Sequence, residues 1–450
     1  MSAGLEIRDP IHGFIHRDLK EKKIVDSKVF QRLRRLKQLA MASLVYPGAV
    51  HTRFDHSLGA FHVARQASTK LLPNSSADQE LVRLAALLHD IGHGPFSHVS
   101  EPILKEFCKI ELDLKKYQIH EIISSRIILE NSELLQILGE NQCQEIVSLL
   151  EGKLGDSLLK DIISGPLDVD KQDYLLRDSY FCGVQYGVYD PNRLLDALTV
   201  HQAADDERYL AISGGGVNSV EQFVLAKYYM SAQVYFHKIR LITDSMIGRG
   251  IALGIKEDKI PWLKDLYSYD GSPEHLREYL DWHDEKLVLE ILSNRTPDGY
   301  AKRIFTRLAD RNLLKRIFSV KENRFENPAL RLSIFDNFDK FRGPLEDLVS
   351  ATFGYEKELV IANLVNFKPA TRTESEIMVL GPKPVGFREE SVLFSSVDEA
   401  IKEQRIEIYA PAIYDDRDNR RKRERDFHEQ IFEMIIKLAN PQTALPLGPG

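Results

Sequence analysis

The sequence is poor in the features that mark several specialised classes of protein. Its 450 residues include three cysteines, Cys108, Cys143 and Cys182, which are scattered and form no Cys-x-x-Cys pair. A disulfide framework or a cysteine-based zinc site is therefore not expected. No apolar run approaches the roughly 20 residues of a membrane-spanning helix, and the N-terminus shows no basic-then-apolar leader pattern. We expect reduced cysteines, a cytoplasmic location and no membrane partner.

A net positive charge is lacking as well. The formal net charge is -7 at pH 7, with 28% charged and 43% hydrophobic residues, so the chain as a whole does not attract nucleic acid or anionic membranes. An anionic substrate would have to be attracted locally. The densest basic run, 420–425, stands among acidic neighbours, which is typical of a solvated helix start. A phosphate or nucleic-acid contact is the alternative reading of this run.

The spacing of apolar residues predicts a mainly α fold. Helical periodicity predicts helices over 30–39, 55–72, 79–91, 120–129 and 219–254. Three short β-rich runs at 359–361, 376–380 and 406–409 predict strands, and a last helix is expected over 420–438. The expected architecture is a helical catalytic lobe of HD type with a smaller α+β C-terminal lobe. We place the catalytic core at 1–255, a helical extension at 256–345, and the mixed lobe with a flexible tail at 346–450.

Histidine and aspartate gather where metal ligands are expected. Seven of the 14 histidines lie between His51 and His120, and one apolar helical run ends in the adjacent His89 and Asp90. Burying such a pair is costly without a partner, and the obvious partner is a divalent metal ion. The candidate ligands, on three expected helices, are His56, His89, Asp90 and Asp170. Two imidazoles and two carboxylates suit Mn, Fe, Mg, Zn and Ni about equally well.

These ligands point to phosphate-ester chemistry. A divalent ion activates water and polarises a phosphoryl oxygen, and the protein must then supply cations for the other oxygens and a proton for the leaving group. The residues available for these tasks are His93, His98 and His120 as proton donors, Arg53 and Lys171 as phosphate clamps, and Glu101 and Glu121 to orient the histidines.

Three motifs carry a resemblance to a known family. They are His51-x-Arg53-x-x-His56-Ser57-Leu58-Gly59, His89-Asp90-x-Gly92-His93-Gly94-Pro95-Phe96-Ser97-His98 and Asp168-x-Asp170-Lys171-x-Asp173-Tyr174-x-x-Arg177-Asp178. With them the chain resembles the HD-superfamily phosphohydrolases, and within that superfamily the deoxynucleoside triphosphate triphosphohydrolases. The likeness runs from Asp9-Pro10 to Met246, more than half of the chain. It implies attack at the α-phosphorus, which releases a deoxynucleoside and inorganic triphosphate.

The resemblance also implies a role for each matching residue. One divalent metal ion would be held by His56, His89, Asp90 and Asp170, and a further Mg could accompany the nucleotide. Proton transfer and phosphate contacts would fall to His93, His98, His120, Glu121 and Glu101. Substrate contacts would come from Gln38, Leu39, Arg53, Lys171, Tyr174, Asp178, Lys227 and Tyr235. Lys227 stands where the family has an arginine, and it lacks the planar fork of that residue.

Regulation and assembly are implied in the same way. Members of the family assemble as oligomers with nucleotide activators between the subunits, so a homo-oligomer, dimer or tetramer, and a nucleotide activator are expected. Asp26, Gln31 and Arg34 match residues of the activator site. Shortly before Asp9, however, Leu5 or Glu6 stands where the family has a lysine, so an activator phosphate would lose one cation there.

Two other classes of function stay open. An HD-type site does not define its leaving group, so the chain could be a nuclease, or a phosphohydrolase acting on another nucleotide or on single-stranded nucleic acid. Tyr174 and Asp178 favour a mononucleotide pocket, whereas the basic run 420–425 favours a polymer. The third reading is a non-catalytic, nucleotide-sensing module. That reading predicts a missing ligand or acid, and none is missing here.

Overall fold

The computed structural model describes residues 5–109, 118–203, 206–367, 377–395, 403–411 and 420–439, the last range without side chains for 420–426. The chain forms two compact units, each built from segments that are distant in sequence. The first unit combines Met1–Tyr235, Pro261–Glu290 and Pro369–Ala400, and the second combines Phe236–Ile260, Ile291–Lys368 and Ile401–Gly450. The predicted domain boundaries, 1–255, 256–345 and 346–450, stay a prediction.

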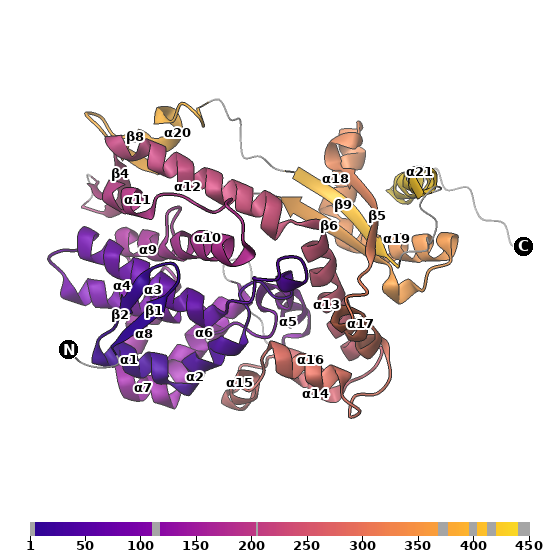
Figure 1. Cartoon of the computed structure of the whole chain (residues 1–450), viewed down its shortest axis with the longest axis horizontal. Helices are drawn as coiled ribbons and strands as arrows, with labels where there is room; N and C mark the ends of the chain where they lie inside the picture. Colours follow the sequence, from indigo (N-terminus) through magenta and orange to yellow (C-terminus); the bar gives the residue numbers. More distant parts are fainter. Residues whose placement is uncertain are drawn as a thin grey trace, which may run out of the picture. The chain divides into compact units, whose positions relative to one another are not determined.

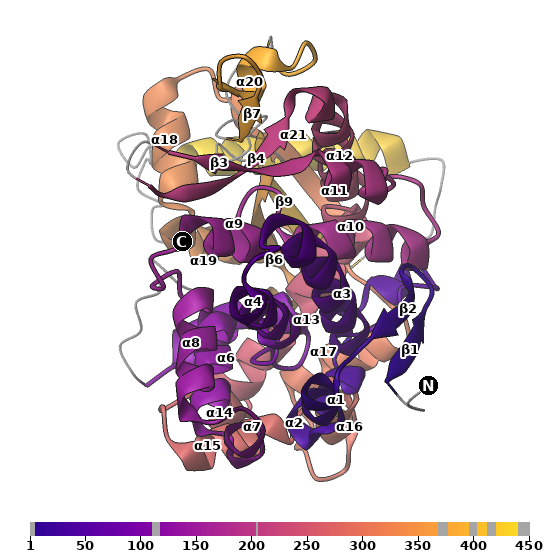
Figure 2. The ribbon, with the colours of Figure 1, turned by 90° about the vertical axis from the view of Figure 1, so that its left-hand side faces the viewer.

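Helices dominate the first unit (Figures 1 and 2). Helix α3 starts from a capping box formed by Thr52 and Asp55, and α10 starts from Asp168, whose carboxylate accepts from the amide of Lys171. Helix α3 packs against both α4 and α10. The helices up to the first sheet are α1 (Leu19–Asp26), α2 (Lys28–Gln31), α3 (Arg53–Leu71), α4 (Ser76–Leu88), α5 (Glu101–Phe107), α6 (Ile119–Glu130), α7 (Ser132–Leu138), α8 (Glu140–Leu150), α9 (Ser157–Ser164), α10 (Val169–Cys182) and α11 (Pro191–Ala197).

Two small sheets complete the first unit, together with later helices. Strands β1 (Glu6–Asp9) and β2 (Gly13–His16) form an antiparallel hairpin. The four-stranded sheet has the order β3-β4-β7-β8, in which β4 and β7 are parallel. Its strands are β3 (Leu198–Gln202), β4 (Arg208–Ser213), β7 (Met378–Leu380) and β8 (Val385–Gly386). The remaining helices are α12 (Val217–Met230), α14 (Pro261–Tyr267), α15 (Pro273–Leu280), α16 (Asp284–Leu292), which extends past this unit, and α20 (Phe387–Glu390).

The second unit is a sheet covered by helices. Its antiparallel strands have the order β5-β9-β6, with β5 (Lys315–Lys321), β9 (Glu403–Ala410) and β6 (Ile361–Phe367). Helices α18 (Pro328–Asp336), α19 (Phe338–Phe353) and α21 (Arg420–Ala439) share one hydrophobic core with this sheet. Helices α13 (Lys238–Lys256) and α17 (Tyr300–Ala309) pack against each other. The predicted fold class, mainly α with a smaller mixed C-terminal region, is confirmed.

Two of the predicted helices are wrong. The segment 30–39 forms only α2 and a 3-10 turn, Arg32–Arg35. Leu36 is extended there because its carbonyl accepts from the amide of Arg53 (2.8 Å), an interaction that helical periodicity does not encode. The expected helix over 219–254 is two helices, because a π turn (Ser231–Tyr235) follows α12 and His237 caps the start of α13.

The predicted strands were incomplete. Strands β7 and β9 were predicted, whereas β6 begins where the expected strand over 359–361 ends. The hairpins β1–β2 and β3–β4 and the strands β5 and β8 were missed, because they lie in regions dominated by helical or turn-rich patterns.

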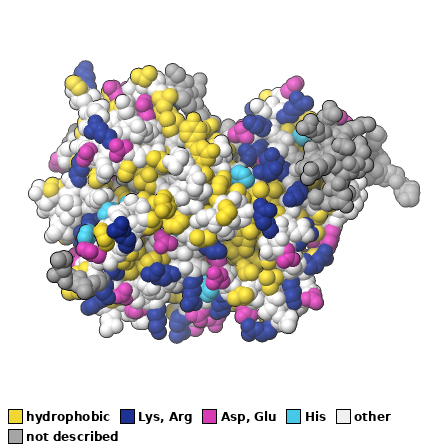
Figure 3. Space-filling view, viewed as in Figure 1, with side chains coloured by type: hydrophobic (Ala, Val, Ile, Leu, Met, Phe, Trp, Pro, Cys, Tyr) yellow, Lys and Arg dark blue, Asp and Glu magenta, His cyan; other side chains and the backbone are white. Residues whose placement is uncertain are grey.

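The described surface carries both signs of charge. Acidic and basic side chains are interspersed on the face drawn in Figure 3. All three cysteines are free, Cys143 and Cys182 being buried. Within the described residues, no helix has the length and apolar character needed to span a membrane. The basic run 420–425 lies in α21, and its side chains are outside the described residues.

Candidate metal centre and active-site cavity

Three helices of the first unit deliver the predicted metal ligands. His56 lies in the first turn of α3, His89 is the C-terminal cap of α4 with Asp90 directly after it, and Asp170 lies in the first turn of α10. Gly92 lets the chain after Asp90 pass against α6, since a Cβ there would lie 2.3 Å from the amide nitrogen of Ser124. Packing of these helices therefore brings together residues that are more than 100 positions apart.

The four ligand side chains converge. His56 Nε2 lies 2.9 Å from Asp170 Oδ1 and 3.7 Å from Asp90 Oδ2. His89 Nε2 lies 3.4 Å from Asp90 Oδ1 and 3.8 Å from Asp170 Oδ1. One ligand atom each from His56, His89 and Asp90 lies within 4.8 Å of the others. The arrangement is an HD-type His/Asp site with the donor atoms facing one centre.

The hydrogen bonds behind the two imidazoles fit a metal ion. His56 Nδ1 donates to Asp173 Oδ2 (2.8 Å), and His89 Nδ1 donates to the carbonyl of Ala86 (2.8 Å). In a neutral ring each donation leaves the lone pair on Nε2, which is the buried atom that faces Asp90 and Asp170. Two buried lone pairs beside two carboxylates are what a divalent cation requires.

Local charges keep both carboxylates ionised. Burial would raise the pKa of Asp90, but the Arg53 guanidinium beside it holds that pKa well below the usual range. The pKa of Asp170 is lowered as well, because hydrogen bonds from His56 and His89 outweigh the effect of burial. Burial opposes a charge on His56, yet Asp170 and Asp173 raise its pKa to about 10, so a bound cation would take the place of the proton between His56 Nε2 and Asp170. The site thus attracts positive charge.

A second group of histidines surrounds a single carboxylate. Glu101 Oε1 accepts from His120 Nδ1 (2.7 Å) and His98 Nδ1 (2.9 Å) and lies 3.5 Å from His93 Nδ1. The rings of His93 and His120 stack with their centroids 3.9 Å apart. His93 Nε2 lies 3.2 Å from Asp90 Oδ1, so the two groups meet at that carboxylate. These four residues also have the spacing of a metal site, but Glu101 already occupies two of the ring nitrogens.

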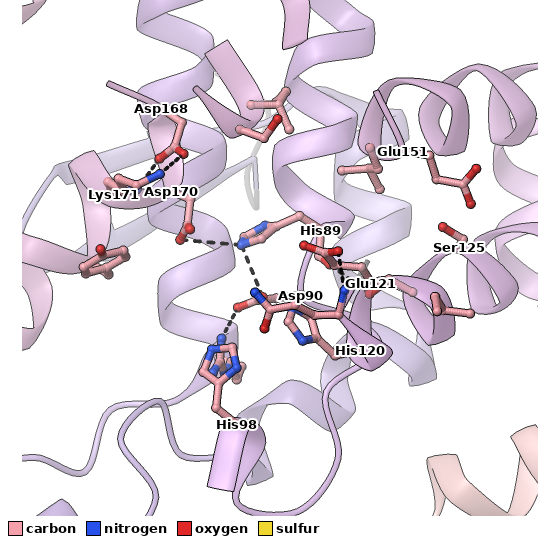
Figure 4. Close-up of a pocket in the computed structure, with 18 of the residues that line it drawn as sticks. His89, Asp90, His98, His120, Glu121, Ser125, Glu151, Asp168, Asp170 and Lys171 are labelled. Carbon is pink, nitrogen blue, oxygen red and sulfur yellow. Dashed lines mark hydrogen bonds and ion pairs between the residues drawn. The ribbon is translucent and has the colours of Figure 1, made fainter. Parts of the chain in front are cut away.

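Members of both groups border one cavity of about 380 Å³ (Figure 4), whereas His56, His93 and Glu101 are not among the described residues that line it. Lys171 also borders it and is held there by an ion pair with Asp168. The predicted site residues among its lining are Gln38, Arg53, His89, Asp90, His98, His120, Glu121, Asp170, Lys171 and Tyr174. This volume falls in the range of small-molecule sites.

Several predicted substrate residues lie elsewhere. Leu39, Asp178, Lys227 and Tyr235 are not among the described residues that line the cavity. Asp178 accepts from the Tyr235 hydroxyl (2.7 Å) and is also bonded to His51, while the Tyr235 ring lies 6.1 Å from that of Tyr174. Asp178 and Tyr235 therefore do not line the cavity themselves, and the residue beside them that does is Tyr174. Arg53 is 3% exposed and is ion-paired with Asp90.

The predicted activator residues lie on α1, α2 and the turn after it. Arg34 donates to the Gln31 side chain (2.8 Å), whose amide donates to the carbonyl of Val25 (2.7 Å). Asp26 is exposed and pairs with Lys22.

Sequence reasoning missed the residue that orients His56. Asp173 is fully buried and bonds His56, His12 and Arg177. Asp173 approaches so closely because residue 59 is glycine, since a Cβ there would lie 1.8 Å from Asp173 Oδ1. Its place in the third motif, three residues after Asp170, was the available signal.

Comparisons with known proteins agree with this geometry. Residues 53–178 match the model of the HD domain, and residues 189–428 match the model of the HD-associated region. An uncharacterised protein of Methanocaldococcus jannaschii is 36% identical over 68% of this chain and 64% of its own length. The deoxynucleoside triphosphate triphosphohydrolase SAMHD1 of Homo sapiens is 30% identical over 69% of this chain and 54% of its own length.

A crystal structure described as a phosphohydrolase from Bacteroides thetaiotaomicron superposes with a TM-score of 0.71 at 26% identity, covering 90% of this chain and 99% of that one. The chain therefore belongs to the HD-domain family and has an HD-associated region after the HD domain. The alignments span only about half to two thirds of the two sequence relatives' own length.

Proposed function

We propose that this HD-domain protein is a metal-dependent phosphohydrolase that converts deoxynucleoside triphosphates to deoxynucleosides and inorganic triphosphate. One observation carries the proposal: a single cavity is bordered by the His/Asp metal site, by the Glu101-centred histidines and by Lys171. Phosphoryl transfer needs all three, namely a cation, proton-transfer groups and positive charge for the phosphates.

The chain's own residues divide this work. A divalent ion held by His56, His89, Asp90 and Asp170 would supply Lewis-acid polarisation at the reacting phosphorus. Lys171 neutralises phosphate charge from the cavity wall. His98 and His120 hold protons whose positions are set by Glu101. Arg53 keeps Asp90 ionised.

The nucleotide sugar would lie against Tyr174. Its ring borders the cavity, and behind it the Tyr235–Asp178–His51 chain of hydrogen bonds fixes the local structure. The identity shared with the human deoxynucleoside triphosphate triphosphohydrolase supports a deoxynucleotide substrate.

One assay separates this function from its alternatives. The purified protein is incubated with each of four deoxynucleoside and four ribonucleoside triphosphates, with added Mn or Mg, and the products are resolved by chromatography. We expect release of inorganic triphosphate from at least one deoxynucleotide. The His89→Ala/Asp90→Ala double variant is the control and should be inactive while folded. Activity that survives in it would contradict the assignment.

The alternatives have their own outcomes when single-stranded DNA and RNA are assayed beside the nucleotides. Degradation of single-stranded DNA or RNA without triphosphate release would indicate a nuclease. Tight nucleotide binding without turnover under several metals would indicate a nucleotide sensor. Adding GTP tests the proposed activator site at Asp26, Gln31 and Arg34, and light scattering under the same conditions tests the proposed homo-oligomer.

A further inference from the structure

Two loops beside the cavity hold a backbone conformation that residues with side chains rarely adopt. Phe96 and Ser97 have φ angles of 62° and 51°, and Ala40 has a φ angle of 47°. This left-handed region is disfavoured for residues other than glycine. The first loop connects His93 to His98, and the second follows Gln38. Such conformations persist where surrounding contacts hold them.

Asp284, the first residue of α16, contacts both loops. Its Oδ1 accepts from the amide of Phe96 (2.8 Å), and its Oδ2 accepts from the amide of Lys37 (2.9 Å). The residue is 4% exposed. A buried carboxylate with one backbone amide on each oxygen fixes the separation of the two loops more tightly than either hydrogen bond alone.

The preceding segment holds the histidine loop at its other end. The hydroxyl of Tyr279 donates to the carbonyl of Gly92 (3.0 Å). Arg32 donates to the carbonyls of His93 (2.8 Å) and Trp282 (3.2 Å). The fit is close, because a Cβ at Gly94 would lie 2.4 Å from the Tyr279 hydroxyl. The end of α15 and the start of α16 therefore brace the loop from Gly92 to Phe96.

The loop is connected to the metal site through Arg53. Arg53 Nε donates to Ser97 Oγ (3.1 Å), and the same guanidinium pairs with Asp90. A shift of the Phe96–Ser97 turn would move Arg53 relative to Asp90 and His98 relative to Glu101.

We propose that Asp284 is a positioning residue for the reaction: by holding the amides of Phe96 and Lys37 together, it sets the distance between the loop that carries His93 and His98 and the loop that carries Gln38. The proposal rests on the proposed function, since it assigns a role within that site. Asp284 itself touches no substrate and acts through these two loops.

The test compares two matched variants. Asp284→Asn keeps the shape of the side chain but offers one acceptor in place of two. Asp258→Asn is the control, because Asp258 also accepts from two backbone amides, those of Tyr300 (3.0 Å) and Ala301 (2.8 Å), but lies in the second unit. For both variants kcat, KM and Tm are measured with the best deoxynucleotide. Hydrogen exchange is followed in the peptides covering 36–40 and 94–99.

We expect Asp284→Asn to lower kcat by about tenfold or more, since small misplacements of reacting groups are costly, and to change KM by less than about threefold. Exchange in both peptides should be faster. Asp258→Asn should lower Tm by a similar amount and leave kcat within about twofold. Should Asp284→Asn fail to fold, Asp284→Glu takes its place. This variant retains the charge but displaces it by one methylene, and we again expect a lower kcat with a nearly unchanged KM.

Equal losses of kcat in both variants at equal Tm, or unchanged exchange in the two loops, would overturn the proposal. Failure of the proposed function is a different result: the unmodified protein would then turn over no deoxynucleotide. In that case the exchange measurement still decides whether Asp284 holds the two loops.

Discussion

The two groups of histidines in the first unit use the same ring in opposite ways. His56 and His89 turn Nδ1 away to fixed acceptors, Asp173 and the carbonyl of Ala86, and keep Nε2 toward the carboxylates. His98 and His120 turn Nδ1 toward Glu101, which lies at the centre of their group. The first arrangement presents lone pairs, and the second presents N–H groups to a carboxylate.

This difference teaches that the hydrogen bond made by Nδ1 of an imidazole indicates whether the ring can bind a metal ion. The presence of the ring in a cluster of histidines does not. Both groups have the spacing of a metal site. Only in the first group do the hydrogen bonds behind the rings free the inward nitrogens. We therefore propose that the first group binds the cation and that the second group transfers protons, and the following predictions test that division.

The largest effect is expected from the metal group. His56→Ala should abolish stoichiometric binding of Mn, measured by elemental analysis or calorimetry, and lower turnover by more than about 10³-fold, because one of two buried lone pairs is lost. His16→Ala is the control, since His16 lies on strand β2 at the surface and pairs with Glu6 (3.2 Å). A His56→Ala protein that keeps both its metal and its turnover would contradict the proposal that the first group binds the cation.

The Glu101 group should respond differently. Glu101→Gln removes the charge that orients the rings of His98 and His120, so kcat should fall by about 10²-fold while the bound metal stays unchanged. The carboxylate is ionised in the folded protein, because hydrogen bonds from His120 and His98 outweigh burial and lower its pKa. Glu130→Gln, which breaks only the surface pair with Arg126, provides the comparison. Loss of metal from Glu101→Gln would show that the two groups act as one.

A smaller effect is expected one step behind the metal group. Gly59→Ala would place a Cβ 1.8 Å from Asp173 Oδ1 and 2.3 Å from Arg177 Nη2. Asp173 must then move away from His56, so metal affinity should fall by about 10- to 100-fold and the free energy of unfolding by about 1–3 kcal/mol.

Gly248→Ala is the matched control, since a Cβ there meets nothing within 4 Å. That change inside α13 should stabilise the protein by about 0.5–1 kcal/mol. Unaltered metal affinity in Gly59→Ala would show that Asp173 does not position His56.

The smallest effect concerns the pH dependence of stability at Asp284. Burial raises the pKa of this carboxyl to about 6, although the amides of Phe96 and Lys37 and the charges of Lys37 and Arg32 act to lower it. A raised carboxyl pKa contributes stability below the ordinary value of about 4, and that contribution is lost as the pH rises through about 6.

The difference in unfolding free energy between the unmodified protein and Asp284→Asn should therefore decrease by about 1–3 kcal/mol from pH 4 to pH 7. Denaturant unfolding at several pH values measures it, and all other titrating groups cancel in the difference. A constant difference over that range would contradict the raised pKa.

Much of the site followed from local sequence. The sequence predicted the metal ligands on three helices, with His56 near the start of one and His89 at the end of another, and the structure has them in the first turn of α3 and at the end of α4, with Asp170 in the first turn of α10. Helix caps and apolar periodicity depend on neighbours within a few residues. These signals survive in a single sequence, and so the mainly α class was predictable.

Other parts depended on contacts that no local pattern records. Leu36 is extended because its carbonyl accepts from the amide of Arg53, the first residue of α3. Asp178 and Tyr235 were expected at the substrate but bond each other beside the cavity. Asp284 contacts the amide of Phe96 across 188 positions of the sequence. None of these has a periodicity or a spacing that the sequence could display.

The amino-acid sequence alone determined the mainly helical class and which side chains are able to bind a cation, because both properties reside in short stretches of chain. Tertiary structure decided which ring nitrogen faces the centre, which carboxylate organises the remaining histidines and which distant residue braces their loop. Those choices arise when buried polar groups from remote segments must satisfy one another, since an unpaired one is costly.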